Sequence, residues 1–414
     1  MISFKNHALS EASVSGKNLH MQHIEDAVIY GGVDGTRQAI AALRSLRDTL
    51  AGTSNNSVDV TVKWDGAPAI FAGEDPTDGR FFVAKKGIFN KNPVVYKTPA
   101  EIDKDTSGDL GVKLKVALRE LAKLGIKGIV QGDIMFTRGD VKEETIDGNH
   151  YLTFQPNTIM YAVPVDSEIG KKIKSASLGV VFHTSYTGKS FESLQASYSV
   201  DISKFTKVSS VWYQDATLHD LSGTATMTSA DTREVTQALS IAGTIFQKIS
   251  GTTLRAIESD PELATTIETF NNSLTRSGSS AESPREHVAK LIRWIRDKSE
   301  KESSARKTEK GKASVDARLT SRLEFFSVEN IGNLELVFEL QNALVTAKNL
   351  LISKLNGLTA MSTFLRTADG FRVTKHEGFV AIDHLRGGAV KLVDRLEFSY
   401  ANFSPEIIKG WQKQ

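Results

Sequence analysis

Two blocks of strand-like sequence, separated by a long helical block, constrain the fold of this 414-residue chain more than any other feature. Segments 58–73 and 80–89 are rich in β-branched and aromatic residues, and the turn-forming run 74–79 between them predicts a β-hairpin. Strand-like sequence continues to about residue 190 and returns at 378–383 and 389–398. The prediction is an α+β body, interrupted by a helical insertion, whose two pieces pair in space.

The remaining segments have helical periodicity. Residues 18–50 place Ile40, Leu43, Leu46 and Leu50 at helical spacing, and 113–125 reads as an amphipathic helix closed by Gly125. Three long helical patterns follow between 190 and 370, whereas the polar run 298–312 predicts a flexible loop. The expected units are an N-terminal helical segment packed on the body (1–57), the first part of the body (58–190), the helical insertion (191–370) and the last part of the body (371–414).

Composition excludes several kinds of protein. The chain has no cysteine, which rules out disulfides, thiolate nucleophiles, iron–sulfur clusters and cysteine-type zinc sites. Its net charge is +2, so any nucleic-acid surface must come from local clustering of charge. No run of 18 apolar residues and no secretory signal occur, which predicts a cytoplasmic protein that does not bind a membrane. The absence of a P-loop and of an H-E-x-x-H motif disfavours P-loop ATPases and zinc peptidases.

The first motif with chemical content is Lys63-Trp64-Asp65-Gly66. A lysine beside a tight Asp-Gly turn can present its amine into a pocket. It becomes a nucleophile only when neutral, which requires desolvation or neighbouring cations. Taken alone, the same four residues also fit a β-turn with an exposed lysine.

Further motifs follow in a fixed order along the chain. Together with the first motif, Gln131-Gly132-Asp133, Glu377-Gly378-Phe379-Val380 and Val390-Lys391-Leu392-Val393 resemble the ordered motifs of the covalent nucleotidyltransferase superfamily: ATP-dependent DNA ligases, RNA ligases and mRNA capping enzymes. Ala84-Lys85-Lys86-Gly87 resembles the basic strand of phage RNA ligases. The chain, especially KWDGAPAIFAG and TFQPNTIMYAVPVDSE, is also similar to proteins of large tailed bacteriophages, a resemblance that implies no activity.

The superfamily resemblance implies a nucleotidyltransferase fold, an ATP-grasp-like ligase adenylation domain of antiparallel sheets with flanking helices. Only about 15 residues follow the last motif strand, so no C-terminal OB-fold is expected. The implied function is an ATP-dependent polynucleotide ligase, acting on RNA rather than DNA. It would use ATP and Mg²⁺, form a lysyl-AMP intermediate, and join a 5′-phosphate to a 3′-hydroxyl.

The resemblance also implies roles for single residues. Lys63 would be the nucleophile, and Lys391 would bind the α-phosphate. Glu377 and Asp133 would bind Mg²⁺, a cation that prefers carboxylate oxygens. The remaining nucleotide contacts are assigned as follows: Asp65 and Gly66 in the first motif, Asp133 on the ribose, Lys85 and Lys86 on phosphates, Tyr161 or Phe182 stacked on adenine, and Arg395 in support of Lys391.

Each of these residues has a structural alternative. Asp133 could simply end a strand, Tyr161 and Phe182 could be core residues, and Lys85 and Lys86 could lie on a solvated strand edge. Glu377 and Lys391 could form an ordinary cross-strand ion pair. His183, in an apolar strand, is expected to be a core histidine.

The sequence departs from the superfamily pattern at three motifs. The first motif usually continues to an arginine, but here it runs Ala67-Pro68-Ala69, so a ribose contact would have to come from elsewhere, for example from Arg80. Asp133 stands where glutamate is usual, and Val393 where a second lysine is usual. Arg395 would share a face with Lys391 if that strand continued, and could compensate. These departures leave two alternatives open: a nucleotidyltransferase that modifies a target other than nucleic acid, and a catalytically degenerate nucleic-acid-binding or virion-associated protein.

The helical insertion contains a stretch rich in basic residues. The stretch could follow a phosphate backbone. It also carries acidic residues, so a solvated loop is the other interpretation. The basic residues are Arg293, Arg296, Lys298, Lys301, Arg306, Lys307, Lys310 and Lys312, and the acidic ones are Asp297, Glu300, Glu302 and Glu309.

Overall fold

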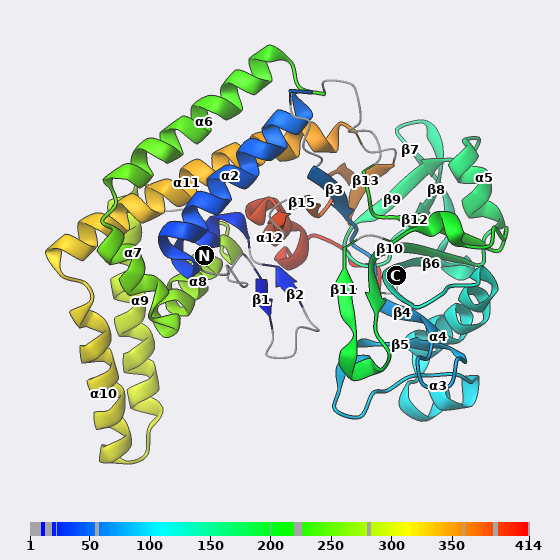
Figure 1. The fold of residues 1–414 in the computed structure, drawn as a ribbon, viewed down its shortest axis with the longest axis horizontal. Coiled ribbons are helices and arrows are strands. Elements are labelled where there is room, and N and C mark those ends of the chain that lie inside the picture. The colour runs from blue at the N-terminus through cyan, green and yellow to red at the C-terminus, as the bar shows by residue number, and fades with distance from the viewer. Residues whose placement is uncertain are drawn as a thin grey trace.

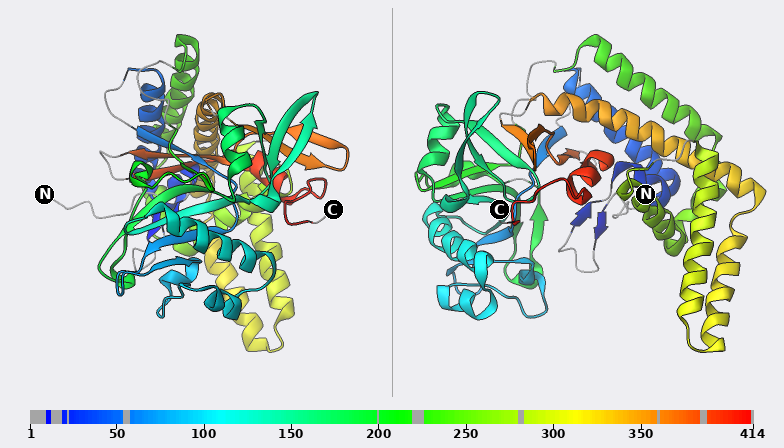
Figure 2. Two further views of the ribbon diagram at one scale, coloured as in Figure 1. Left: turned by 90° about the vertical axis from the view of Figure 1, so that its right-hand side faces the viewer. Right: turned by 180° about the vertical axis from the view of Figure 1, so that it is seen from behind.

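The computed structural model describes residues 10–12, 19–21, 23–53, 58–198, 200–218, 226–279, 283–358, 361–383 and 388–412. A helical unit lies on one side of the molecule and a β-rich unit on the other (Figure 1). Figure 2 shows the same division from two further directions. The fold is therefore mixed α+β, as the sequence predicted.

The helices and strands have the following bounds. The helices are α1 (Ala27–Tyr30), α2 (Gly32–Leu50), α3 (Pro99–Asp105), α4 (Gly108–Leu121), α5 (Glu168–Ser175), α6 (Ser229–Lys248), α7 (Gly251–Glu258), α8 (Pro261–Arg276), α9 (Pro284–Ala305), α10 (Glu309–Glu324), α11 (Val328–Asn356) and α12 (Arg395–Phe403). The strands are β1 (Ser10–Ala12), β2 (Leu19–Met21), β3 (Val58–Lys63), β4 (Ala69–Glu74), β5 (Phe81–Ala84), β6 (Ile129–Thr137), β7 (Lys142–Ile146), β8 (Asn149–Phe154), β9 (Met160–Pro164), β10 (Leu178–Thr187), β11 (Gln195–Ser197), β12 (Val211–Asp215), β13 (Ser362–Thr367), β14 (Gly370–Val373), β15 (Gly378–Asp383) and β16 (Gly388–Leu392).

The helical unit is built around α11, which packs against α6, α9 and α2. The periodic apolar residues of α2 are buried, among them Leu43, Leu46 and Leu50. Helix α2 also contacts α6 and α7, so it joins the helical unit through its apolar face. Of the expected insertion 191–370, the helices occupy Ser229–Asn356, whereas β11–β14 belong to the sheets of the β unit.

The prediction of a loop at 298–312 is wrong. Helix α9 runs to Ala305, and α10 begins at Glu309 after Thr308, whose side chain accepts a hydrogen bond from the Gly311 amide. Lysine and glutamate make up eight of the 15 residues of this stretch, and both are good helix formers even where little is buried. The low complexity of this stretch therefore did not indicate a loop. The two helices pack against each other as a hairpin that extends from the helical unit (Figure 1).

The β unit contains three larger sheets with mainly antiparallel pairing. A six-stranded sheet has the order β11-β10-β6-β4-β5, with β12 parallel to β10, and a five-stranded sheet has the order β14-β13-β9-β8-β7. The predicted hairpin is confirmed as β4–β5. Apolar residues of α3 and α4 pack with Val130 of β6 and Val180 of β10, so these helices cover one face of the six-stranded sheet.

The third sheet, β16-β15-β3, joins the two strand blocks. Strand β15 pairs with β3 and with β16, which confirms that the two pieces of the body meet in space. The predicted strand 389–398 is wrong in its second half. Asp394 caps a helix by accepting from the amides of Leu396 and Glu397, so Arg395 begins α12.

Among the described residues, no helix is both long and apolar enough to cross a membrane.

Candidate functional site

Sheet register brings two predicted lysines to one face. Lys63 lies opposite Gly378, and Lys391 lies opposite Val380, two residues further along β15. Because side chains alternate along a strand, Lys63 and Lys391 point to the same side of the sheet. Val62, Phe379 and Leu392 occupy the other side and are buried in the main core. The apolar face therefore packs the sheet onto the main core, and Lys63 and Lys391 lie on the opposite face.

Glu377 completes this face. It precedes β15, and its carboxylate forms an ion pair with the Lys63 ammonium. The Glu377 side chain is 10% exposed, against 31% for Lys63. A Cβ atom on Gly378 would lie 2.4 Å from the Leu392 carbonyl oxygen. Glycine is thus required where β15 approaches β16, directly after Glu377. The ion pair joins Glu377 to Lys63, and not to Lys391 as one alternative held.

Asp133 reaches the same place from the six-stranded sheet. A Cβ atom on Gly66 would lie 2.5 Å from the Asp133 Cβ, so the glycine of the first motif lets the chain pass close to β6. Burial raises the pKa of Asp133 to about 7; the Lys63 ammonium opposes the rise and the Glu377 carboxylate adds to it. The three charges therefore lie within electrostatic reach of one another. Asp133 lies within β6 and does not end it.

Lys391 is held in a setting that disfavours its charge. Burial, and then the nearby Lys63 ammonium, lower its pKa. No ion pair of Lys391 occurs within the part of the chain that the structure describes. An anionic group between the two lysines would relieve this electrostatic cost.

Asp65 has a structural role at the edge of the site. Its carboxylate accepts from Asn157 Nδ2 at 2.6 Å and from the amides of Thr158 and Ile159 at 2.7 and 2.6 Å. Burial, reinforced by Glu377, raises its pKa to about 6. The first motif therefore uses its aspartate to anchor the segment before β9, which leaves Lys63 at the surface of the fold.

The two rings predicted to stack on adenine are core residues. Tyr161 is fully buried, packs on Trp64 and Phe154, and accepts a hydrogen bond from the Asp65 amide at 2.7 Å. Phe182 is also fully buried, beside Phe205 beneath the helix-covered face of the six-stranded sheet. Neither ring offers a face to a ligand in this structure.

His183, the neighbour of Phe182 on β10, was expected to be a core histidine, and its place beside the site was not predicted. The pairing of β10 with β6 shifts register between Phe182 and Thr184, so His183 lies at a β-bulge, and its ring lies near Asp133. His183 Nε2 is 3.8 Å from Asp133 Oδ2, and the imidazole is 30% exposed. Burial, with Lys63 nearby, lowers the pKa of His183 to about 4, so the ring is neutral. Because a bulge interrupts the alternation of β10 here, no simple pattern in the sequence placed His183 beside the site.

The other predicted basic residues divide between site and scaffold. Lys86 is exposed and near enough to lower the pKa of Asp133. Lys85 forms an ion pair with Asp105 at 2.8 Å and lies 5.8 Å from the Tyr96 ring centre, so it belongs to the scaffold.

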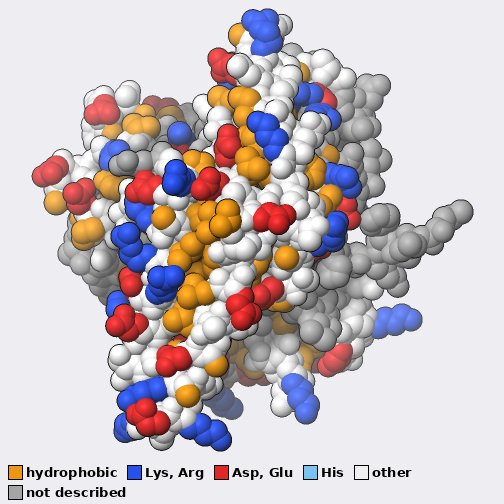
Figure 3. All heavy atoms as spheres, turned by 90° about the vertical axis from the view of Figure 1, so that its left-hand side faces the viewer, with side chains coloured by type: hydrophobic (Ala, Val, Ile, Leu, Met, Phe, Trp, Pro, Cys, Tyr) orange, Lys and Arg blue, Asp and Glu red, His pale blue; other side chains and the backbone are white. Residues whose placement is uncertain are grey.

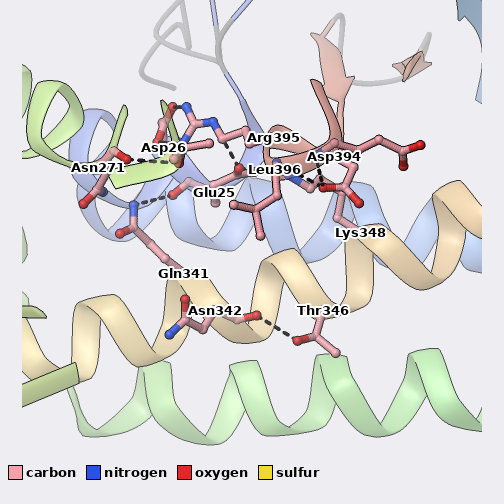
Figure 4. A network of polar contacts seen from close by, with 12 residues as sticks. Glu25, Asp26, Asn271, Gln341, Asn342, Thr346, Lys348, Asp394, Arg395 and Leu396 are labelled. Atoms are coloured by element: carbon pink, nitrogen blue, oxygen red, sulfur yellow. Dashed lines mark hydrogen bonds and ion pairs between the residues drawn. The ribbon is translucent and has the colours of Figure 1, made fainter. Parts of the chain in front are cut away.

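Arg395 cannot support Lys391 from a shared strand, because it belongs to α12. Its guanidinium forms an ion pair with Asp26 and lies 3.5 Å from Glu25. Figure 4 shows that these carboxylates also meet α11, where Lys348 Nζ donates to both Glu25 oxygens at 2.9 Å. This buried network of Glu25, Asp26, Lys348 and Arg395 ties the N-terminal segment, α11 and α12 together behind the site.

A metal ion would find two hard donors here. Within the described ranges, no group of three or more His, Asp or Glu side chains is arranged to hold a metal ion. Glu377 and Asp133 supply carboxylates that feel each other's charge. Because Mg²⁺ is commonly bound by one or two carboxylates together with substrate phosphates, this donor set fits a Mg²⁺ ion that arrives with a nucleotide.

Comparison with known proteins gives the family. No curated protein and no solved structure matches the chain. One family model, described as a family of unknown function (DUF6267), matches residues 18–407. That match spans the helical unit and both pieces of the β unit, so the chain belongs to the DUF6267 family.

Proposed function

We propose that this protein is a covalent nucleotidyltransferase that attaches AMP to Lys63 and passes it to the 5′-phosphate of a polynucleotide, RNA rather than DNA. One observation carries the proposal. Lys63 and Lys391 share one face of a sheet, Glu377 pairs with Lys63 from the residue before β15, and Asp133 meets them from a second sheet. Four motifs far apart in the sequence thus supply a lysine, a partner carboxylate, a second cation and a second carboxylate to one place.

The proposed first step is attack by Lys63 Nζ on the α-phosphorus of ATP. A nitrogen–phosphorus bond forms, the bond to the bridging oxygen of pyrophosphate breaks, and pyrophosphate leaves with that electron pair. The Lys63 ammonium must first lose a proton. The Lys63 side chain is 31% exposed, so this proton can pass to solvent while the Glu377 carboxylate stays ionised. Such a step depends on positioning and on charge neutralisation more than on further covalent chemistry.

The surrounding residues would position the nucleotide. Lys391 is suited to the α-phosphate oxygens, because burial and the Lys63 ammonium lower its pKa and a bound phosphate would offset that cost. Lys86 would face the outer phosphates. The neutral ring of His183 is the partly exposed ring on this face, and we assign to it the contact with the base in place of Tyr161 and Phe182.

Glu377 and Asp133 are the residues that would hold Mg²⁺, which would supply charge neutralisation at the phosphates. Asp133 must be deprotonated to serve as a ligand. Its pKa near 7 places that change in the neutral range.

The later steps of the proposed reaction move the AMP. A 5′-phosphate oxygen attacks the lysyl-AMP phosphorus and releases Lys63, and a 3′-hydroxyl then attacks the activated phosphate and releases AMP. Arg395, the residue expected to strengthen the final motif, is engaged in the buried network. Among the described residues of the final motif, Lys391 would therefore be the one basic residue that acts at the site.

The test is intact mass after incubation with ATP and Mg²⁺. We expect a gain of one AMP in the wild type, none in Lys63→Ala, and an unchanged gain in Lys142→Ala, which removes an exposed strand lysine far from the site motifs. Protein free of prior adenylation that gains no AMP, or Lys63→Ala protein that labels fully, would overturn the proposal.

A substrate panel then separates the acceptors. Transfer of the label to 5′-phosphorylated single-stranded RNA, nicked RNA or nicked DNA would identify the polynucleotide. Robust labelling of Lys63 that no polynucleotide end discharges would instead indicate a target that is not a nucleic acid.

A further inference from the structure

A polar hollow lies in the helical unit, between α8, α9 and α10. Its volume is about 250 Å³. The lining includes Trp294 and Lys298 of α9 together with Arg318 and Arg322 of α10. Two carboxylates, Glu262 and Glu302, complete the charged part of the lining. The hollow therefore combines an indole ring with three cations, outside the site described above.

The carboxylates of the hollow are already neutralised. Glu302 pairs with Arg306 and with Arg318, and Glu262 lies 3.2 Å from Arg322. Asp260 holds the same Arg322 at 2.7 Å, and the Arg322 side chain is only 11% exposed. A guanidinium has five N–H donors, so an arginine fixed in this way keeps donors for a ligand.

Lys298 and the indole extend the hollow along the surface of α9. Lys290, Trp294, Lys298 and Lys301 follow one another at spacings of four, four and three residues, which places them in one row along the helix. Lys298 Nζ lies 4.7 Å from the centre of the Trp294 ring. Neither Lys298 nor Lys301 has an ion-pair partner among the described residues.

Charge is concentrated in this hairpin. Residues 284–324 contain 12 Lys and Arg and seven Asp and Glu, a net charge of +5. The whole chain is +2, so the remainder carries −3. The hairpin projects from the rest of the helical unit (Figure 1), and Lys and Arg side chains lie at the lower end of the face shown in Figure 3.

We infer that the row Lys290–Trp294–Lys298–Lys301 and the adjoining hollow form a contact site for single-stranded nucleic acid. Lys290 is paired with Glu286 at 2.7 Å, so Lys298 and Lys301 are the lysines of the row that would neutralise phosphates. The indole would stack an unpaired base, and this combination is used by proteins that bind single strands. A duplex offers no free base to the indole. The inference rests on the proposed function, because it gives the polynucleotide substrate a second contact.

The experiment measures binding of a labelled single-stranded oligonucleotide by fluorescence anisotropy, without ATP, over a series of salt concentrations. Lys298→Gln with Lys301→Gln removes two exposed charges from a helix. We expect on the order of tenfold weaker binding, and a salt slope smaller by about 1.4, since each lost contact to a single strand contributes roughly 0.7.

Lys171→Gln with Lys172→Gln is the matched control, because both lysines are exposed on a helix, α5, of the β unit. We expect it to bind like the wild type. A third variant, Trp294→Leu, keeps an apolar side chain and should weaken binding of a single strand roughly tenfold with the salt slope unchanged. Melting curves establish that each variant is folded.

Three results would overturn the inference. The first two are equal losses in the α9 and α5 double variants, and wild-type protein that binds no single strand. Equal displacement of the oligonucleotide by polyglutamate would also overturn it and indicate an acidic protein partner. Failure of the proposed function is distinguishable, because AMP labelling of Lys63 is measured separately. Binding without labelling would leave this inference in place and remove the proposed function.

Discussion

Replacing Lys348 by methionine should cost about 3 kcal/mol of unfolding free energy. Lys348 is fully buried, and its ammonium donates to both oxygens of the buried Glu25. Removing one partner of a buried ion pair costs roughly 3–5 kcal/mol, because the remaining charge loses its compensation. The lower end applies here, since Arg395 stays 3.5 Å from Glu25.

The pKa of Glu25 gives an independent magnitude. Burial alone would raise it, but Lys348 and Arg395 outweigh burial and lower it from 4.5 to about 2. That shift corresponds to about 3 kcal/mol of stability at neutral pH. Because the folded-state pKa is lowered, this stability is present above pH 4.5 and is lost as the pH falls toward 2. In Lys348→Met, much of that acid-dependent loss should already have occurred at pH 7.

The assay is urea unfolding followed by circular dichroism. Lys354→Met is the control, since Lys354 lies on the same helix and pairs with Asp231 at 2.7 Å, with its side chain 38% exposed. An exposed pair contributes about 0–1 kcal/mol, so the control should lose less than a third as much. Adding Glu25→Gln to Lys348→Met should restore part of the loss. Equal costs for the two lysines, or strict additivity with Glu25→Gln, would refute the reasoning.

Two further predictions concern the site. The initial rate of AMP labelling should rise with pH through about 7 in the wild type, because Asp133 must lose its proton to hold Mg²⁺. In Asp133→Asn this inflection should vanish. An unchanged pH profile would exclude Asp133 as the titrating group. Gly66→Ala would place a Cβ atom 2.5 Å from the Asp133 Cβ, so labelling should fall at least tenfold. The control Gly139→Ala meets no atom within 4 Å of its Cβ, and it should label as the wild type does when both variants are folded.

The sequence predicted elements correctly where the hydrophobic pattern of a segment matches the face that the fold buries. The hairpin β4–β5, the strand β6 and the meeting of the two strand blocks followed from alternation and from turn residues. The convergence of Lys63, Glu377 and Lys391 was also implied, because all three flank or occupy strands of one sheet. Their proposed chemistry still awaits the mass measurement.

The features that could not be predicted depend on contacts between distant segments. The elements packed behind each sheet decide which ring of β10 or β9 faces a ligand. Phe182 and Tyr161 were therefore misjudged, and His183 was taken for a core residue. Arg395 leaves the strand because Asp394 caps a helix, and its partner Asp26 lies 369 residues earlier in the chain. No local pattern reports a partner at that separation.

Chain order sets when the candidate site can form. Strand β3 needs β15 at its edge, and the residues between them include the whole helical unit. A ribosome that has made the lysine must still add more than 300 residues before Glu377 and Lys391 exist to meet it. Until then β3 keeps an unsatisfied edge, a state that favours association with other strands. The order of synthesis would therefore keep Lys63 without Glu377 and Lys391 until translation is nearly complete.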